Sequence, residues 1–265
     1  MAMECVGESC LESRPTVVIF VGPAGAGKSS IVASYGRWLR EQGYRVATLN
    51  LDPAAEYIPY QPDFDVGKIV NAREIALREG LGPNGALIRS IEVLTERLGE
   101  ILEWLRGCRA DFLLVDTPGQ MELFVFRDLS HRFIDALKGL ARALLVVFVV
   151  DAEMLRDASD YAFLALMCTA IQLRLDVDVV AVVNKVDRVE KLPSGLRTWV
   201  ELLDEASKVL SERGAYGDMM ARLVEIVASY SKAMHVPAVS ARTGVGMEDL
   251  HRIVHEVTCS CGDLT

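Results

Sequence analysis

The sequence predicts an α/β protein of three layers, in which helices cover both faces of a mainly parallel central sheet. Continuous apolar runs alternate along the chain with segments of helical periodicity, as they do when strands and helices follow one another in turn. Most of the apolar runs lack polar alternation, which is expected of parallel strands that are covered on both faces. A glycine-rich loop separates the first apolar run from the first helical segment. This order of elements predicts a three-layer sandwich.

The expected elements follow the chain in order. Six apolar runs are expected to form strands: Thr16–Val21, Arg45–Leu51, Phe112–Val115, Leu144–Val150, Val179–Val183 and His235–Val239. Seven amphipathic segments are expected to form helices: Ser29–Glu41, Val66–Glu79, Leu87–Arg106, Met121–Leu137, Ala158–Arg174, the longer region Thr198–Lys232, and Met247–Val257. We interpret residues 1–265 as a single domain, with a core at about residues 15–257 and a mostly helical insertion at about residues 188–234, before the last strand.

Composition and charge exclude several classes of protein. Hydrophobic residues make up 51% and charged residues 25% of the chain, a globular mixture that excludes disorder throughout. The formal net charge of −9 argues against a surface that neutralises a nucleic-acid backbone, so no direct nucleic-acid binding is expected. The longest apolar run, Ala143–Val150, is far shorter than the roughly 20 residues of a membrane span. The first residues lack the features of a signal peptide, and we expect a cytoplasmic protein without membrane contact.

The six cysteines fit that location. Cys108 and Cys168 lie in apolar segments and are expected to be small core residues. Four cysteines lie near the ends of the chain: Cys5, Cys10, Cys259 and Cys261. They could together form a thiolate metal site, although their spacings differ from the usual Cys-x₂₋₄-Cys pairs of zinc sites. Ordinary terminal thiols are the favoured interpretation, and disulfides also stay open.

A phosphate-binding loop follows the first expected strand. Gly22-Pro-Ala-Gly-Ala-Gly-Lys28-Ser29 matches the pattern G-x-x-x-x-G-K-[ST] in full. Its glycines allow a tight turn that directs backbone N–H groups at phosphate oxygens, and the helix that follows presents its positive end to the same anion. The lysine neutralises the phosphates, and the first serine hydroxyl ligates Mg²⁺. The sequence therefore predicts a P-loop NTPase fold, with a nucleotide held by Gly25, Ala26, Gly27, Lys28, Ser29 and Ser30.

A second motif, Asp116-Thr-Pro-Gly119-Gln120, follows the strand expected at Phe112–Val115. An acidic residue at the carboxyl end of a parallel strand suits a contact to Mg²⁺, so Asp116 is a candidate metal residue. Gly119 can place a backbone N–H beside the terminal phosphate, and Gln120 can orient the attacking water. The alternative is a turn that caps a helix.

A third motif indicates which base is bound. Asn184-Lys185-Val-Asp187 follows the strand expected at Val179–Val183 and resembles the guanine-reading N-K-x-D motif of GTPases. A carboxylate at Asp187 can accept both N1–H and N2–H of guanine, a pair of donors that adenine lacks, while the stem of Lys185 lies along the ring. Ser240-Ala241-Arg242 resembles the S-A-x element whose backbone contacts guanine O6.

Two further motifs narrow the class. Leu51-Asp52-Pro53-Ala54 ends the second expected strand, and Gly82-Pro83-Asn84 is expected in a loop between two helices. Together with Asp116-Thr-Pro-Gly-Gln-Met-Glu122, these segments resemble the GPN-loop GTPases, an archaeal-type homodimeric family of the SIMIBI class. The resemblance extends from about Pro15 to Val257.

The resemblance implies a constitutive dimer in which the Gly82-Pro83-Asn84 loop reaches into the partner's site, where the Asn84 amide contacts phosphate during its transfer. It further implies that Asp52 lies near Mg²⁺ or the attacking water, and that Glu122 positions water. The alternatives are a simple turn for the first segment, a capping role for Asp52 and a helix-dipole contact for Glu122. Pro23 and Ala24 replace the second lysine that many SIMIBI ATPases carry in the P-loop.

The expected function is that of a Mg²⁺-dependent GTPase acting as a homodimeric switch. Eukaryotic members of the family are linked to RNA polymerase assembly, so the resemblance implies an assembly factor for a large complex of that kind. Two alternatives stay open. A metallochaperone-type GTPase is suggested by Cys259-Ser-Cys261, and a small-molecule kinase by the phosphate loop alone.

Overall fold

The computed structural model describes residues 14–190, 199–230 and 235–258. Its centre is a sheet in which every paired strand is parallel, in the order β3-β2-β4-β1-β5-β6. The strands are β1 (Thr16–Val21), β2 (Val46–Asn50), β3 (Phe64–Asp65), β4 (Phe112–Asp116), β5 (Ala143–Asp151) and β6 (Val179–Asn184). The α/β three-layer prediction is confirmed, and the sheet is wholly rather than mainly parallel.

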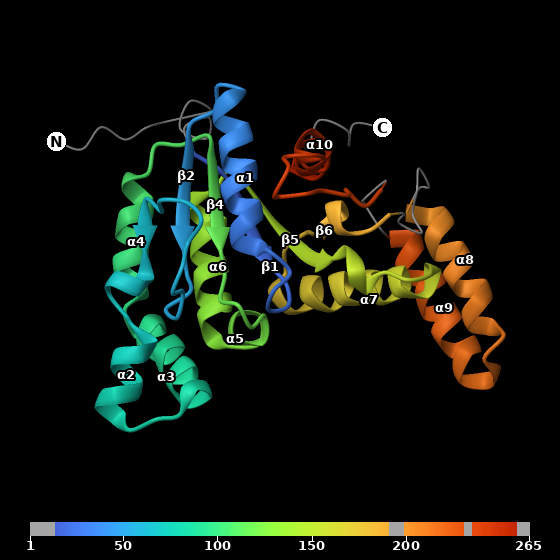
Figure 1. The fold of residues 1–265 in the computed structure, drawn as a ribbon, viewed down its shortest axis with the longest axis horizontal. Helices are drawn as coiled ribbons and strands as arrows, with labels where there is room; N and C mark the ends of the chain where they lie inside the picture. The colour runs from blue at the N-terminus through green and yellow to red at the C-terminus, as the bar shows by residue number, and fades with distance from the viewer. Residues whose placement is uncertain (1–13, 191–198, 231–234, 259–265) are drawn as a thin grey trace.

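The strand order places the predicted motifs along one edge of the sheet. β1 lies between β4 and β5, with Phe20 opposite Asp116, and β5 lies beside β6, with Asp151 opposite Asn184. Figure 1 shows β2 and β4 pointing toward the edge at which three helices lie: α2 (Ala72–Glu79), α3 (Pro83–Glu96) and α5 (Glu122–Val125). Because parallel strands end together, the segments that follow β1, β2, β4 and β6 meet at this carboxyl edge.

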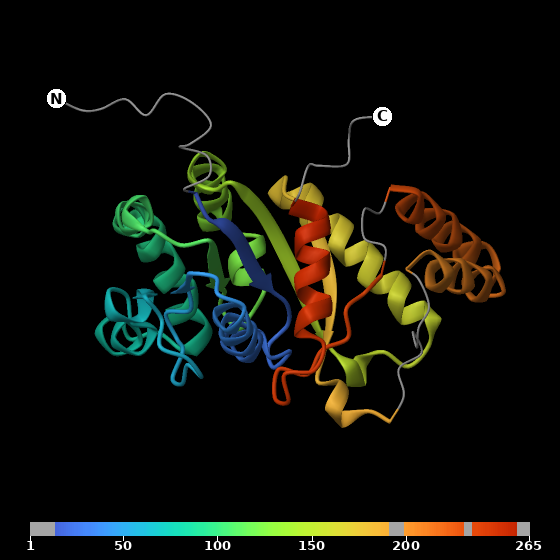
Figure 2. The same cartoon turned by 90° about the horizontal axis from the view of Figure 1, so that it is seen from above.

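One face of the sheet is covered by α1 (Lys28–Glu41) and α10 (Met247–Thr258), which lie side by side in Figure 2. Both helices are amphipathic, and their apolar sides join the β1, β4 and β5 side chains of this face in one core. Tyr35 and Leu39 of α1 are fully buried there. This packing fixes the helix that begins at the phosphate loop.

The other face is covered by α4 (Leu98–Gly107), α6 (Asp128–Leu140) and α7 (Ala158–Leu175), whose apolar residues form the larger core with the opposite side chains of the strands. Beyond α7 lie α8 (Trp199–Ser211) and α9 (Gly214–Tyr230), which pack against each other and against α7. Figure 1 shows this pair at the right end of the molecule. Both helices fall within the predicted insertion.

Four of the expected helical segments are interrupted in the structure, and one of them is Thr198–Lys232, which contains both α8 and α9. The segment predicted at Val66–Glu79 is a 3₁₀ turn, Val66–Lys68, followed by α2 (Ala72–Glu79). Asn71 separates them because its side chain accepts from two N–H groups of α2, which favours a helix start at that point. The segment predicted at Leu87–Arg106 is divided at Arg97 into α3 (Pro83–Glu96) and α4.

The segment predicted at Met121–Leu137 is divided into α5 (Glu122–Val125) and α6. Arg127, between them, has an extended backbone (φ −112°, ψ 161°) that a helix cannot include.

The last expected strand is wrong in extent. His235–Val239 contributes only an isolated parallel bridge between Val183 and Ala238. Pro237 accepts from Val183 through its carbonyl, but its nitrogen carries no hydrogen to extend the ladder.

Among the described residues, no helix has both the length and the apolar composition that a membrane span requires. The four terminal cysteines lie outside the described ranges.

Candidate functional site

The phosphate loop connects β1 to α1 through three glycines with positive φ angles. These angles are 150° at Gly22, 79° at Gly25 and 91° at Gly27. A Cβ atom on Gly22 would lie 2.2 Å from the carbonyl oxygen of Val149, and one on Gly27 would lie 2.4 Å from Nδ2 of Asn184. Two of the glycines therefore also permit close packing against β5 and the end of β6.

Lys28 begins α1 with its side chain buried beneath this loop. Its ammonium donates to the carbonyl oxygens of Gly22 (3.0 Å), Pro23 (3.3 Å) and Gly119 (3.0 Å). Burial lowers the pKa of the ammonium, and the nearby carboxylates of Asp116, Asp52 and Glu122 act in the opposite direction. The cation therefore lies where the phosphate loop meets the segment after β4.

Asp116 ends β4 and is 2% exposed. Its Oδ2 accepts from the Tyr60 hydroxyl over 3.1 Å, whereas its Oδ1 is buried without a hydrogen-bond partner. Burial raises the pKa of this carboxyl group to about 6, although hydrogen bonds from Ser29 and Tyr60 and the charge of Lys28 act to lower it. A buried, unpaired carboxylate oxygen is costly unless a further donor or cation is supplied.

The side-chain oxygens of Ser29, Asp52 and Asp116 are suitable ligands for Mg²⁺, which prefers hard oxygen ligands. The Ser29 hydroxyl interacts with Asp116, and Asp52 lies close enough to raise the pKa of Asp116 through its charge. The three predicted metal residues therefore form one group around Lys28. Among the residues that the structure describes, no group of three or more His, Cys, Asp or Glu side chains is arranged to hold a metal ion.

Asp52 links the second strand to the segment after β4. Its Oδ1 accepts from the N–H of Ala54 over 2.9 Å, and its Oδ2 accepts from the N–H of Gly119 over 3.2 Å. Burial raises the pKa of Asp52, and these two hydrogen bonds act to lower it. The side chain therefore both caps its own turn, as the alternative interpretation held, and reaches the proposed phosphate-sensing glycine.

Asn184 joins the phosphate loop to the base-reading segments. Its Nδ2 donates to the carbonyl of Ala26 over 2.9 Å, and its Oδ1 accepts from the N–H of Ala241 over 3.1 Å. The side chain is 1% exposed, so both of these hydrogen bonds are protected from water.

Asp187 lies beyond Asn184 with its side chain exposed, and its Oδ1 accepts from the Ser240 hydroxyl over 2.7 Å. This hydrogen bond is the main cause of the lowered pKa of the Asp187 carboxyl group. Lys185, between the two, forms an ion pair with Asp151. The carboxylate is therefore held ionised and open to solvent, as an acceptor for ligand N–H groups must be.

The GPN segment begins a helix rather than lying wholly in a loop. Gly82 is the N-cap of α3, while Pro83 and Asn84 belong to its first turn. Proline is favoured at this position because its fixed φ suits a helix and its missing N–H would have no helical partner. All three residues are exposed. Among the described residues, no hydrogen bond joins the side chain of Asn84 to the phosphate loop of its own chain.

Gln120 and Glu122 follow Asp116 at the start of α5. Gln120 is half-buried and its carbonyl accepts from the N–H of Leu123, while Glu122 is exposed in the first turn of the helix. The Glu122 charge nevertheless raises the pKa of Lys28. The Glu122 carboxylate therefore lies near the ammonium of Lys28, and it also occupies the position that the helix dipole favours. Gln120 directly follows Gly119, whose carbonyl accepts from Lys28.

Comparisons with known proteins identify the relatives of this chain. Residues 20–260 match a family described as "Conserved hypothetical ATP binding protein". The GPN-loop GTPase PAB0955 of Pyrococcus abyssi is 36% identical over 253 residues, which cover 94% of this chain and all of that protein. The GPN-loop GTPase 3 of Dictyostelium discoideum is 32% identical over 64% of this chain and 60% of its own length.

A crystal structure of PAB0955, described as a GTPase in apo form, superimposes with a TM-score of 0.79 at 33% identity, covering 93% of this chain and 98% of the other. The chain belongs to the GPN-loop GTPase family. The family model's description refers to ATP, whereas the relatives are GTPases. In this GPN-loop GTPase, Asp187 presents an exposed carboxylate, the kind of acceptor that the two N–H donors of guanine require and for which adenine has no matching pair of donors.

Sequence reasoning missed two residues of the GPN-loop GTPase site. Tyr60 lies in the loop between β2 and β3, and no local pattern indicates that it reaches Asp116. Asp151 directly follows the apolar run of β5, and an acidic residue at the carboxyl end of a parallel strand was a usable signal. The same signal identified Asp116.

Proposed function

We propose that this GPN-loop GTPase binds GTP with Mg²⁺ and hydrolyses it as a homodimeric switch. The observation that carries the proposal is the position of Asn184, whose amide bonds the phosphate loop on one side and the Ser240-Ala241 segment on the other. One side chain therefore sets the distance between a phosphate site and a base site. A ligand that occupies both sites is a nucleotide.

Mg²⁺ would be held by the Ser29 hydroxyl and the Asp116 carboxylate, with Asp52 beside them. The unpaired Oδ1 of Asp116 supports this assignment. When bound, the ion would neutralise phosphate charge during transfer.

Hydrolysis would begin with a change in two hydrogen bonds of Gly119, which lies in the segment after β4. Gly119 donates its N–H to Asp52 and accepts from Lys28 through its carbonyl. The two donors in these contacts are the N–H of Gly119 and the ammonium of Lys28. A terminal phosphate is a stronger acceptor for both of them, so its arrival would release Asp52 from Gly119. The freed carboxylate, together with Gln120 and Glu122, would then orient the attacking water. Loss of the phosphate would restore the original contacts, which makes the segment after β4 a switch.

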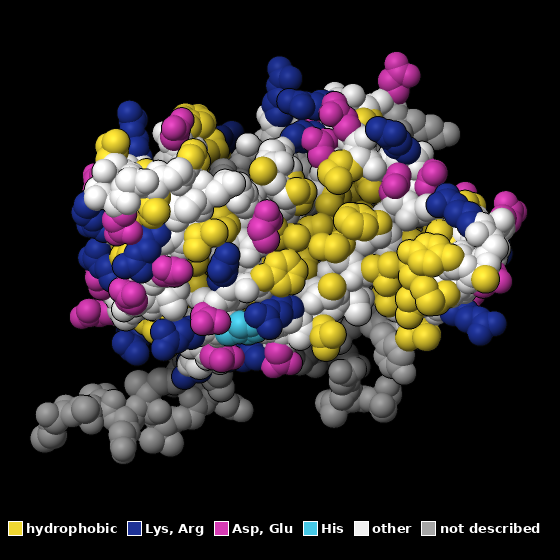
Figure 3. All heavy atoms as spheres, turned by 90° about the horizontal axis from the view of Figure 1, so that it is seen from below, with side chains coloured by type: hydrophobic (Ala, Val, Ile, Leu, Met, Phe, Trp, Pro, Cys, Tyr) yellow, Lys and Arg dark blue, Asp and Glu magenta, His cyan; other side chains and the backbone are white. Residues whose placement is uncertain are grey.

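The dimer would complete the site through the partner's Asn84. Figure 3 looks onto the carboxyl edge of the sheet and shows hydrophobic side chains gathered at its centre and over α8 and α9. Phe126, Met154 and Phe163 are each about half exposed, at 54%, 49% and 49%. Contiguous exposed apolar surface is typical of protein interfaces. A twofold pairing across this face would bring each α3 start toward the other chain.

A role as an assembly factor for a large complex, with RNA polymerase as the client, follows from the family resemblance. GTP-dependent burial and exposure of the apolar surface would suit transient binding of unassembled subunits. Capture by the Asn84→Ala protein loaded with GTP, followed by identification of the bound proteins, tests this role.

The enzymatic proposal is tested by phosphate release from GTP and ATP with Mg²⁺ or with EDTA. We expect release from GTP alone, dependent on Mg²⁺, with GDP as the organic product. Equal use of ATP would contradict the base assignment, and transfer of phosphate to a metabolite would indicate a kinase. Stoichiometric zinc or nickel in the purified protein would instead favour a metallochaperone.

A further inference from the structure

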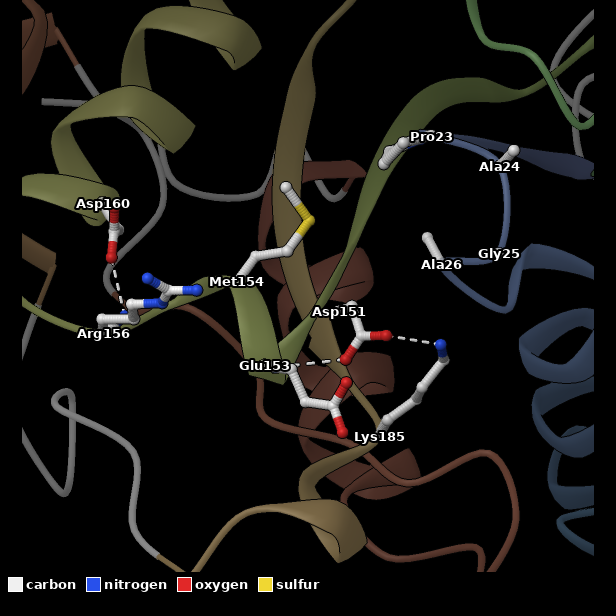
Figure 4. A pocket seen from close by; sticks show the side chains of 10 residues that line it. All are labelled: Pro23, Ala24, Gly25, Ala26, Asp151, Glu153, Met154, Arg156, Asp160 and Lys185. Atoms are coloured by element: carbon white, nitrogen blue, oxygen red, sulfur yellow. Dashed lines mark hydrogen bonds and ion pairs between the residues drawn. The ribbon is translucent and has the colours of Figure 1, made fainter.

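An ion pair joins the ends of two neighbouring strands beside the phosphate loop. Nζ of Lys185 lies 2.5 Å from Oδ2 of Asp151, and the two side chains are only 21% and 16% exposed. Asp151 ends β5 and is opposite Asn184 in the sheet. Figure 4 shows the pair meeting at one wall of a cavity of about 680 Å³ that the phosphate loop also lines. None of the hydrolytic steps above requires this contact.

The backbone of Lys185 is as constrained as its side chain. Its φ angle of +65° is left-handed, a conformation that residues with side chains rarely adopt. The N–H of Val186 donates to the carbonyl of Val239, and that of Arg188 to the carbonyl of Lys185. A Cβ atom on Gly27 would lie 3.8 Å from Cε of Lys185. The aliphatic stem of Lys185 therefore runs close to the phosphate loop. Its direction is fixed by the backbone at one end and by the ion pair of the ammonium with Asp151 at the other.

Asp151 is itself held in place. Its Oδ1 accepts from the N–H of Glu153 over 3.1 Å, which leaves Oδ2 to face the lysine. The other charged side chains that line the cavity are Glu153, Arg156 and Asp160. Asp160 is engaged by the N–H of Arg156. Asp151 is therefore the residue that determines where the ammonium of Lys185 lies.

We propose that Asp151 is a positioning residue for base binding: it anchors the ammonium of Lys185 so that the aliphatic stem forms a fixed wall against the guanine ring. The inference rests on the proposed function, since it assumes that Lys185 contacts the base. Lysine has many rotamers, and restricting them before the nucleotide arrives lowers the entropic cost of binding.

The test measures nucleotide affinity of variants by calorimetry. Asp151→Ala should weaken GDP binding about tenfold, the factor that corresponds to the loss of one well-ordered contact. Asp151→Asn, which can still accept from Nζ, should have a smaller effect. Inosine diphosphate, which lacks the exocyclic amine of guanine, should weaken by the same factor, because contact with an apolar stem does not distinguish purines. Glu153→Gln, a carboxylate change in the same cavity, is the matched control and should leave affinity unchanged.

Inorganic triphosphate serves as a ligand without a base. Its affinity should not change in Asp151→Ala. If it weakens as much as GDP, Asp151 acts through the phosphate loop and the inference is overturned. Thermal unfolding of each variant checks the fold, and Asp151→Asn replaces the alanine variant if the latter is unfolded.

Lys185→Ala separates the inference from the function on which it rests. If Lys185→Ala binds GDP normally, the proposed base site is wrong. If it weakens GDP binding but the two Asp151 variants do not, the base site stands and the positioning role fails. If the base site and the positioning role are both correct, adding Asp151→Asn to Lys185→Ala should cause no further loss of GDP affinity, because the ammonium that Asp151 positions is already gone.

Discussion

The Tyr60 hydroxyl donates to Oδ2 of Asp116 across 3.1 Å, while Oδ1 of the same carboxylate is buried without a partner. Tyr60 comes from the loop between β2 and β3 and is itself partly buried, which raises the pKa of its hydroxyl. It is therefore a neutral donor at any physiological pH. The loop between β2 and β3 thus contacts the proposed metal residue directly. Its position therefore depends on whether the Asp116 carboxylate is ionised and what it binds.

This relationship predicts the pH dependence of nucleotide binding. Burial raises the pKa of Asp116 to about 6, so the carboxyl group is ionised above that pH and protonated below it. Mg²⁺ binding requires the ionised form. The affinity for Mg²⁺–GDP should therefore be constant above about pH 7 and fall as the pH decreases through about 6, by up to about tenfold per pH unit.

Tyr60→Phe should move this midpoint upward, because the Tyr60 hydrogen bond is one of the contacts that lower the pKa of Asp116. Calorimetric titrations between pH 5 and 8 would measure both midpoints. Tyr57→Phe, at a fully solvated tyrosine of the same loop (80% exposed), is the control. A midpoint that does not differ between Tyr60→Phe and the unmodified chain would contradict the role of Tyr60.

Base selectivity should depend on Asp187. Asp187→Asn replaces an acceptor carboxylate by an amide, which can donate to the C2 carbonyl of xanthine. We expect GTP affinity to fall roughly 30- to 1000-fold and the preference to move to xanthosine triphosphate. Competition binding with the two nucleotides measures the change. Arg188→Gln, at the exposed neighbouring residue, should bind both as the unmodified protein does; a similar change there would indicate a nonspecific effect of charge.

Two glycines of the phosphate loop provide a matched pair for stability. Gly25→Ala introduces a Cβ into open space at a positive φ, so only the left-handed backbone is penalised, by about 1–2 kcal/mol. Gly22→Ala adds a clash with the carbonyl oxygen of Val149 and should lower the free energy of unfolding by about 3 kcal/mol or more. Denaturant unfolding without nucleotide measures both. Equal losses would mean that the loop moves to relieve the clash.

The sequence could predict the fold because buried parallel strands leave a clear pattern. β1, β4, β5 and β6 are nearly uninterrupted apolar runs, and the last three of them end at the polar residues Asp116, Asp151 and Asn184. β3 has only two residues and therefore no periodicity to detect. The breaks at Asn71 and Arg127 depend on capping and backbone geometry, which a helical pattern of apolar residues does not record.

The candidate site was predictable where its residues belong to contiguous motifs. Lys28 follows β1, and Asp116 and Asn184 are the last residues of β4 and β6, so their meeting at one edge follows from the topology. Tyr60 and Asp151 make their contacts across loops and neighbouring strands, at separations of 56 and 34 residues. Pairing of this kind depends on sheet order, which the sequence alone left open.

The position of Asn84 leads to a prediction about where it acts. The residue is exposed at the start of α3, and no described hydrogen bond joins its side chain to the phosphate loop of its own chain. If it completes the partner's site, Asn84→Ala should bind GTP almost normally but hydrolyse it slowly, because the lost contact forms chiefly during phosphate transfer. Lys28→Ala should lose triphosphate binding. Each variant alone should therefore be nearly inactive, for different reasons.

Mixing the two variants under conditions of subunit exchange should restore activity. In a mixed dimer, the Asn84→Ala chain keeps an intact phosphate loop and receives an intact Asn84 from its Lys28→Ala partner. Random pairing of equal amounts gives about half mixed dimers with one working site each, so activity should approach about one quarter of normal. If Asn84 acts within its own chain, no site in any dimer has both groups and activity stays at the level of the separate variants. Differently tagged chains, isolated as the mixed dimer and shown to bind one GTP, ensure that a lack of recovery reflects chemistry rather than failed exchange.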